Sequence, residues 1–530
     1  MPPAFEGGVE PERQDLVRQP ERDDAASHGE DVGVVVLARE ASGIEIVAER
    51  GANAGDLIGG DLFALAAAAE HDAAIGAAVG DAAADGDADW RIVDRRLAVR
   101  ALVNDRVAEP GERLLQVFFE REARMIGADS DIHNADCTVR FTALMNPTIV
   151  ISARGEQRLL GGHPWIYRAD VAEARAAAGD IVQVRSPRGQ MLGSAIFSDR
   201  SQITLRMLTY GEAVADEALI RRRIEAAIAF RTSLNIDATA YRLVHGEADL
   251  LPSLIVDRYG DYVVVQALSQ GMDRLLPVVV STLTELLQPR GILARNDPRA
   301  RVLDGLEQRV DVLAGEVPET VTITETGIEY DVDLRHGQKT GLFLDQRENR
   351  VAAAAYARGR MLDCFSYNGG FALVLGKHCK ETIAFDVSED AVARVKANAA
   401  RNKIAVDARV GNVFDELRGL DRTGEKFDTI VLDPPAFAKN KAAVTNARAG
   451  YKEINLRALK LLRPGGTLVT CSCSYNINEA AFAEIVYDAS VDAQAHVTVV
   501  EKRMQGRDHP VLLGVPETYY LKCFILRKIV

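Results

Sequence analysis

From about residue 340 to the C-terminus, short apolar runs alternate with stretches whose apolar residues recur at helical spacing. The apolar runs are, in chain order, RMLDCFS, ETIAFDV, DARVGNVF, FDTIVLDPP and GGTLVTCSC. Runs of this length between turn residues are typical of buried strands, and their alternation with helices is typical of a parallel sheet. The pattern predicts an α/β domain over residues 336–530, with a doubly wound, mostly parallel sheet and helices on both faces.

The two preceding regions have different patterns. Residues 145–225 contain the short alternating segments DIVQVRS, MLGSAIF and QITLRML, separated by Gly, Pro and Asp, which predict a small β-barrel. Residues 226–335 mix helical patterns with the strand-like stretch SLIVDRYGDYVVVQAL, which predicts a small α+β module. We therefore expect three domains between residues 145 and 530.

Residues 1–144 lack a sustained pattern of either period. Runs such as LFALAAAAEHDAAIGAAVGDAAADGDADW are rich in Ala, Asp and Gly, and the region has a net charge of −15, against −14 for the whole chain. Such a composition buries too little apolar surface to offset the entropy lost on ordering. We expect a low-order acidic extension, either an acidic interaction arm or a mis-assigned start that precedes the true one at Met145.

Composition narrows the class of protein. The chain has 530 residues, 47% of them hydrophobic, with no long uncharged apolar window and no basic start followed by an apolar core. We therefore expect neither a membrane partner nor a secretory signal. Six cysteines without regular spacing, and no CxxC or HxxxH pair, indicate a reducing cytoplasmic location and no metal site.

The first two predicted strands of the α/β domain have a cofactor-binding pattern. The first ends near Asp363 and is followed by a turn with Gly369 and Gly370, where glycines let the backbone approach a ligand closely. The second ends at Asp386, where an acid suits the hydroxyls of a ribose. Nicotinamide, flavin and S-adenosylmethionine enzymes share this arrangement. Asp386 also has a structural alternative, as the N-cap of the next helix.

The fourth predicted strand separates these cofactor classes. It ends in Asp433, and Pro434 and Pro435 stiffen the following turn, so that the carboxylate is held where a substrate base would lie. An Asp- or Asn-Pro-Pro sequence at this strand is the mark of S-adenosylmethionine-dependent nucleobase methyltransferases. Ala436, followed by Phe437, stands where many amino-group methyltransferases have an aromatic residue directly after the prolines.

Longer motifs provide a resemblance to a known family. They are GGHPWIYR, LVHGEADLLPSLIVDRYGDYVVVQ, GQKTGLFLDQRENR, LDCFSYNGGFAL, LDPPAFAKNK, LRPGGTLVTCSCS and, near the C-terminus, DHP followed by ETYYLKCF. In this order, over residues 146–530, the chain resembles the bacterial 23S rRNA (cytosine-C5) methyltransferases with an N-terminal PUA domain. The resemblance implies a PUA barrel, a central α+β module and a Rossmann-like class I methyltransferase domain closed by an antiparallel hairpin. Residues 1–144 have no counterpart in it.

The resemblance also implies the cofactor, S-adenosylmethionine, and its contacts. Asp363 and the turn over residues 366–370 are expected to face the methionine part, and Asp386 the ribose. Asn412 stands where the family usually has an Asp near the adenine, and its amide oxygen can accept the same hydrogen bond. GQKTGLFLDQR is expected to line the cofactor or base pocket, with core packing as the alternative for Phe343. The expected cofactor-binding residues are Asp363, Ser366, Asn368, Gly369, Gly370, Asp386, Asn412, Lys339, Phe343, Asp345 and Arg347.

The implied reaction needs a nucleophile, because C5 of a pyrimidine is itself a poor one. A thiolate that adds to C6 makes C5 enolate-like, and loss of the C5 proton after methylation expels the thiolate. Cys473, in SCS, is the expected nucleophile, and Asp433 the acid that stabilises the adduct at N3. Cys471 is the second candidate, which an alternative TCS reading favours. Core packing and redox pairing are the non-catalytic alternatives for the cysteines.

The expected partner is 23S rRNA, either free or within a large-subunit particle, and a homodimer is one option for the oligomeric state. Arginines reach phosphates, and flipped or single-stranded bases suit this chemistry. The expected RNA-binding residues are Arg154, Arg158, Arg185, Arg188, Lys439 and Lys441. Two alternative functions stay open: methylation of guanine N7 or another base, and a ribosome assembly factor that binds S-adenosylmethionine without catalysis.

Overall fold

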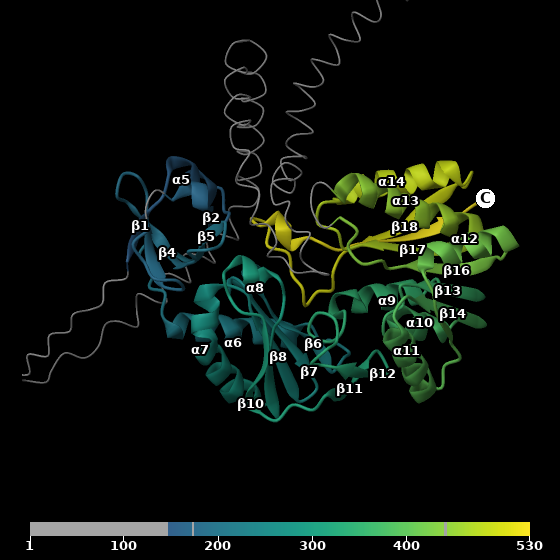
Figure 1. Cartoon of the computed structure of the whole chain (residues 1–530), viewed down its shortest axis with the longest axis horizontal. Helices are drawn as coiled ribbons and strands as arrows, with labels where there is room; N and C mark the ends of the chain where they lie inside the picture. Colours follow the sequence, from purple (N-terminus) through teal and green to yellow (C-terminus); the bar gives the residue numbers. More distant parts are fainter. Residues whose placement is uncertain (1–146, 172–173, 439–442) are drawn as a thin grey trace, which may run out of the picture. The chain divides into compact units, whose positions relative to one another are not determined.

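The computed structural model describes residues 147–171, 174–438 and 443–530 (Figure 1). The predictions for residues 1–144, and for Lys439 and Lys441, lie outside the described residues. Within the described ranges, no helix combines the length and apolar character that a membrane span requires.

The first described part is a small β structure. Its five-stranded sheet has the order β1-β3-β4-β5-β2, in which β1 and β3 are parallel and the other pairs antiparallel. The three predicted alternating segments form β3, β4 and β5, and their apolar side chains form a core with Ile166 of β2. Trp165 of the same strand is buried in a separate cluster. The elements are β1 (Thr148–Val150), α5 (Ala153–Leu160), β2 (Trp165–Tyr167), η3 (Arg168–Asp170), β3 (Ile181–Arg185), β4 (Met191–Phe197) and β5 (Ile203–Tyr210).

The second part is the expected α+β module. Its sheet has the order β10-β9-β8-β7-β6, with one parallel pair, β8 and β9, connected through helix α7. A separate hairpin, β11–β12, follows. The elements are α6 (Glu217–Ser233), β6 (Ala240–His245), η4 (Gly246–Asp249), β7 (Leu254–Tyr259), β8 (Tyr262–Ala267), α7 (Gln270–Leu287), β9 (Gly291–Asn296), α8 (Ala300–Leu303), β10 (Arg309–Gly315), β11 (Thr320–Glu325) and β12 (Ile328–Asp333).

The third part is built on a seven-stranded sheet of order β15-β14-β13-β16-β17-β19-β18. The five strands predicted from the sequence are β13 to β17, all parallel, and β18 and β19 add the expected antiparallel hairpin. Its strands are β13 (Arg360–Cys364), β14 (Glu381–Asp386), β15 (Asp407–Val410), β16 (Phe427–Leu432), β17 (Leu462–Ser472), β18 (Val497–Arg503) and β19 (Lys522–Lys528). The helices are η5 (Leu344–Gln346), α9 (Arg347–Ala354), α10 (Gly370–Gly376), α11 (Glu389–Asn402), α12 (Val413–Thr423), α13 (Val444–Leu461), α14 (Glu479–Asp492) and η7 (Pro516–Thr518).

Helices cover both faces of this sheet (Figure 1). Because side chains alternate along a strand, neighbouring residues enter opposite cores. Leu468 packs in the core with α12, α13 and α14, whereas Val469 and Cys471 pack in the core that includes α9, α10 and α11. The connections leave the carboxyl ends of β13, β14, β16 and β17 at one edge of the sheet, where ligands of open α/β folds bind.

Candidate active site

One cavity of about 360 Å³ lies at this edge of the sheet. Both residues expected to react, Asp433 after β16 and Cys473 after β17, line it. The expected site residues in its lining are Lys339, Phe343, Asp345, Asp363, Ser366, Asn368, Gly370, Asp386, Asn412, Asp433 and Cys473. Gly369, Arg347 and Cys471 are not among the lining residues. The cavity therefore brings together residues that are more than 130 positions apart in the chain.

The turn between β13 and α10 forms one wall and has an unusual backbone. Phe365, Tyr367 and Gly369 have φ values of 65°, 45° and 82°, which are left-handed conformations that non-glycine residues adopt under strain. The Tyr367 N–H donates to Asp386 Oδ2 at 2.9 Å, which helps to hold this turn. Gly370 is required for another reason, because a Cβ there would lie 2.9 Å from Arg350 Nε.

Asp363 lies buried beneath this turn. Its Oδ2 accepts a hydrogen bond from the Ala372 N–H at 2.8 Å, and burial raises the pKa of its carboxyl well above the usual range. Ser366 Oγ, in the same cavity wall, is buried without a hydrogen-bond partner among the described residues. A ligand with a cationic group and polar hydrogens would satisfy both side chains. S-adenosylmethionine has an ammonium and a sulfonium, so these residues fit this cofactor.

Asp386 and Asn412 lie at the carboxyl ends of the next two strands: Asp386 is the last residue of β14, and Asn412 lies between β15 and α12. Asp386 is not the N-cap of α11, because Ser388 occupies that position and accepts from the Ala391 N–H. The structural alternative for Asp386 is therefore wrong. Asn412 does cap its helix, α12, with Oδ1 accepting from the Phe414 N–H at 3.0 Å. Its amide nitrogen donates nothing to that cap, and its side chain lies exposed at the cavity.

Lys339 and Asp345 place a cation in the cavity wall. Lys339 Nζ donates to Asp345 Oδ2 at 2.6 Å and lies 4.6 Å from the centre of the Phe343 ring, while Tyr520 OH donates to the same oxygen at 2.7 Å. Burial opposes ionisation of Asp345, but the nearby Lys339 and these hydrogen bonds hold its pKa below the usual range. Phe343 lines the cavity and also packs edge-on against Tyr367, so the pocket role and the packing role expected for it are compatible.

Asp433 has a different environment from Asp345. Its Oδ1 accepts from Gln346 Nε2 at 2.8 Å, and the Gln346 amide is itself fixed by Asn349 Nδ2 at 2.7 Å. Burial, with the negative Asp345 nearby, raises the pKa of Asp433 to about 6. A carboxyl with this pKa can donate a proton near neutral pH, as the proposed role at N3 of a cytosine needs.

The two cysteines of GGTLVTCSC lie in different environments. Cys471 is inside β17, directly opposite Cys523 of β19, and is fully buried in the core shared with α9 and α10. Cys473 follows the last residue of β17, Ser472, and is partly exposed in the cavity. Burial, followed by the negative Asp433, raises the pKa of the Cys473 thiol to about 12.

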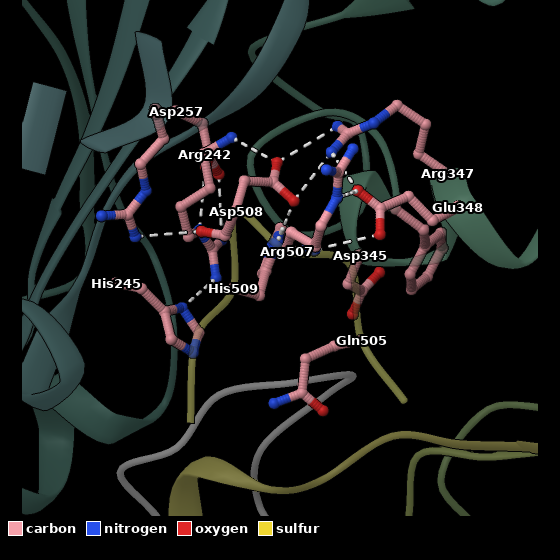
Figure 2. A network of polar contacts seen from close by, with 12 residues as sticks. Arg242, His245, Asp257, Asp345, Arg347, Glu348, Gln505, Arg507, Asp508 and His509 are labelled. Atoms are coloured by element: carbon pink, nitrogen blue, oxygen red, sulfur yellow. Dashed lines mark hydrogen bonds and ion pairs between the residues drawn. The ribbon is translucent and has the colours of Figure 1, made fainter. Parts of the chain in front are cut away.

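Arg347 belongs to a buried ion network (Figure 2) rather than to the cavity wall. Its guanidinium donates to both carboxylate oxygens of Asp508, at 2.9 and 3.1 Å. Asp508 Oδ2 also accepts from the Arg242 N–H at 3.0 Å, and the Arg242 side chain binds Asp257 through two hydrogen bonds. The network connects strands β6 and β7 to Arg347, the first residue of α9, which lies two positions after Asp345 in η5.

The expected RNA-binding arginines are mostly engaged within the β part. Arg154 and Arg158 donate to the two oxygens of the buried Asp170, at 2.7 and 2.5 Å. Arg185 donates to the Gly189 carbonyl, and Arg188 is exposed in the same turn. Asp170 is held by these contacts, so Arg154 and Arg158 have a structural role whether or not they also contact RNA.

Four residues that contact the site residues were not predicted from the sequence. Gln346 and Arg350 lie in GQKTGLFLDQRENR, and Tyr520 and Lys522 in ETYYLKCF. Their positions in these motifs are the available signal, but their contacts join segments far apart in the chain. Among the described residues, no cluster of His, Cys, Asp or Glu could hold a metal ion.

Comparison with known sequences identifies relatives over most of the chain. Residues 258–511 match the family described as S-adenosylmethionine-dependent methyltransferase, and residues 149–210 the PUA-like domain. The chain is 41% identical over 397 residues to ribosomal RNA large subunit methyltransferase I of Tolumonas auensis, which covers 73% of this chain and 100% of that protein. The enzyme of the same name from Klebsiella pneumoniae strain 342 is 38% identical over 399 residues, with the same coverage.

Solved structures agree on the fold. The methyltransferase SMU.776 in complex with SAH has a TM-score of 0.64 and 21% identity, covering 72% of this chain and 100% of its own. A SAM-dependent methyltransferase from Streptococcus mutans gives a TM-score of 0.63 with the same identity and coverage. The predicted fold class, a class I methyltransferase domain preceded by a PUA-like structure and a central module, is confirmed.

Proposed function

The chain belongs to the ribosomal RNA large subunit methyltransferase I family, and from this premise we propose that it methylates C5 of a cytosine through a covalent adduct with Cys473. Its activity is S-adenosylmethionine-dependent methylation of large-subunit rRNA. The observation that supports the C5 chemistry is the presence of Cys473 and Asp433 in one cavity, with Cys471 excluded from it. Neither guanine N7 methylation nor cofactor binding without catalysis needs a thiol there.

The cofactor supplies an electrophilic methyl group. Asp363, the turn over residues 366–370, Asp386 and Asn412 would hold it, because they form the wall on the β13, β14 and β15 side of the cavity. Asp386 suits ribose hydroxyls because carboxylate oxygens can accept further hydrogen bonds besides those from Tyr367 and Ser388.

The cytosine then occupies the side of the cavity near β16 and β17. Cys473 Sγ, as the thiolate, forms a bond to C6; the C5–C6 π pair shifts to a C4–C5 double bond, and N3 receives a hydrogen bond or proton from the Asp433 carboxyl. The C4–C5 pair then forms the bond to the methyl carbon as the bond from that carbon to the cofactor sulfur breaks, and N3 returns its proton to Asp433. Loss of the C5 proton restores the double bond, and the Sγ–C6 bond breaks with its electron pair returning to sulfur.

The domain limits and RNA contacts are part of the same proposal. We place boundaries at residues 145 and 336, the latter supported by the gap between β12, which ends at Asp333, and η5, which begins at Leu344. The expected boundary at residue 226 is wrong, because it falls inside α6 (Glu217–Ser233), whose side chains pack in the core of the central module; we place that limit between β5 and α6. Arg188 is the member of the arginine set best placed for phosphate, because it is exposed. Binding of free rRNA or of a large-subunit particle, and a homodimer, stay predictions.

The proposed function is tested on rRNA from cells that lack this protein. Purified protein and S-adenosylmethionine should produce 5-methylcytosine in large-subunit rRNA, measured by digestion and mass spectrometry. The Cys473→Ala protein should bind the cofactor but produce none. Appearance of 7-methylguanine instead, or full activity of Cys473→Ala, would contradict the proposal.

A further inference from the structure

Lys522 is a buried lysine that the activity proposed above does not use. It is the first residue of β19 and lies opposite Ser472, the last residue of β17, in the antiparallel ladder. Its side chain turns toward the chain after that strand, where Nζ donates to the carbonyls of Ser474 at 2.7 Å and Tyr520 at 2.9 Å. Cys473 is therefore held on both sides by the same residue, through the ladder at Ser472 and through the ammonium at Ser474.

Lys522 lacks a carboxylate partner within the ion pairs of the described residues. Glu479, the carboxylate that raises the pKa of Lys522, has other partners: it pairs with Lys502 at 2.9 Å and accepts from Tyr519 OH at 2.7 Å. A buried cation with only main-chain carbonyls as partners is costly, and proteins rarely bury lysine without a counter-charge. The charge of a Cys473 thiolate would supply that counter-charge.

The electrostatics of the two groups agree with this geometry. Burial lowers the pKa of Lys522 to about 7, and Cys473 is the first neighbour that acts in the opposite direction. Burial raises the pKa of the Cys473 thiol, Asp433 and Asp345 add to this increase, and Lys339 and Lys522 oppose it. Separately, each charged form is unfavourable; together, an ammonium and a thiolate stabilise each other.

We propose that Lys522 is the positioning residue of the nucleophile: it fixes the Cys473–Ser474 backbone and provides the positive charge that balances the Cys473 thiolate. This inference rests on the proposed role of Cys473. Lys522 contacts neither rRNA nor cofactor in this role and acts only through the thiol. It explains why a lysine stands in the C-terminal motif ETYYLKCF, far in sequence from the cysteine that it serves.

The test is alkylation of Cys473 by iodoacetamide in the full-length protein without RNA, located by tandem mass spectrometry, between pH 6 and pH 9. If the reactive form is the thiolate beside a charged Lys522, the wild-type alkylation rate rises with pH up to about 7, where the pair loses its first proton, and then levels. It levels because the pair with a charged Lys522 and a thiolate has the same number of protons as the pair with a neutral Lys522 and a thiol, so the ratio of the two does not change with pH. Lys522→Met should react about tenfold more slowly at pH 6.5 and approach the wild-type rate by pH 9. Lys522→Arg, which stays charged, should match wild type at pH 6.5 and exceed it at pH 9.

The matched control is Lys528→Met. Lys528 also lies on β19 and donates to two main-chain carbonyls, those of Leu459 and Leu462, both at 2.9 Å, but no Cys473 charge affects it. Its alkylation profile should equal that of wild type. Asp433, Asp345 and Lys339 also face Cys473, and their influence cancels in the ratio of variant to wild type at each pH.

Two results would overturn the inference. One is a Lys522→Met rate that equals wild type at every pH, and the other is a reduction by the same factor at every pH, which indicates packing alone. If Lys522→Met does not fold, judged by its melting curve, Lys522→Arg decides: a profile parallel to wild type up to pH 9 is the contradicting result. Failure of the proposed function is distinguishable, because Cys473→Ala would then still methylate rRNA whatever the alkylation profiles show.

Discussion

At the scale of single residues, the environment of each side chain decides its chemistry. Asp345 stays ionised beside Lys339, whereas the pKa of Asp433 rises to about 6 through burial near that negative charge. The sequence predicts that Asp433 and Cys473 take part, because each follows a strand of the parallel sheet. It cannot predict the pKa of either group, since the pKa of Asp433 depends on Gln346 and that of the Cys473 thiol on Lys522, both from distant segments.

The pH dependence of kcat/KM for Asp433→Asn, compared with that of wild type, tests the role of Asp433 as an acid. A carboxyl that must be protonated to act at N3 loses its active form above its pKa of about 6, whereas an amide donor does not titrate. The ratio of wild-type kcat/KM to that of Asp433→Asn should be constant below pH 6 and fall about tenfold per pH unit above it, measured with an RNA substrate. A ratio that rises above pH 6 would show that the ionised carboxylate is the active form.

Asp386→Ala tests the cofactor side. Removal of a charged hydrogen-bond acceptor typically costs about 1.5–3 kcal/mol, so S-adenosylmethionine should bind roughly ten- to a hundredfold more weakly by calorimetry. The control is Asp407→Ala, in which an exposed acid paired with Arg409 on neighbouring strand β15 is removed. Unchanged binding by Asp386→Ala would rule out the ribose role.

At the scale of elements, the ends of strands and the turns after them determine the site. The five parallel strands are predictable from their apolar runs, because buried strands have a clear sequence pattern. The end of β17 at Ser472 is not predictable in the same way, since an extended 467–473 would direct both cysteines to one face. Pairing with β19 stops at Ser472, which leaves Cys473 free of the ladder and in the cavity.

Gly369→Ala tests the turn after β13. At a φ of 82° an alanine is strained, so the variant should lose about 1–2 kcal/mol of unfolding free energy in urea and bind the cofactor more weakly. The matched control is Gly419→Ala in the middle of α12, where a Cβ would meet nothing within 4 Å. That variant should gain about 0.5–1 kcal/mol. Equal effects of both substitutions would contradict the conformational argument.

At the scale of the whole molecule, buried ion pairs connect parts that the sequence presents as separate modules. Arg242 and Asp257 of the central sheet reach Arg347 through Asp508, close to Asp345 of the cavity (Figure 2). The three-part order could be predicted because each part has its own periodicity. This network could not, because its members are isolated polar residues whose partners are up to 266 positions away.

A chain that begins at Met145 tests the interpretation of residues 1–144. Their composition favours little burial of apolar surface, and the relatives align in full with about 73% of this chain. The shortened protein should therefore keep its melting temperature, its affinity for S-adenosylmethionine and its methylation rate. A lower melting temperature or a loss of cofactor binding would assign these residues a part in the fold.

The most direct test of the central claim, covalent catalysis by Cys473, is trapping with RNA that contains 5-fluorocytosine at the target position. The fluorine on C5 cannot leave as a proton does, so the adduct should persist as a protein–RNA complex on a denaturing gel when S-adenosylmethionine is present. Wild type and Cys471→Ala should form this complex, and Cys473→Ala should not. The reverse pattern would make Cys471 the nucleophile, and the lack of any adduct with both cysteines intact would contradict the covalent mechanism.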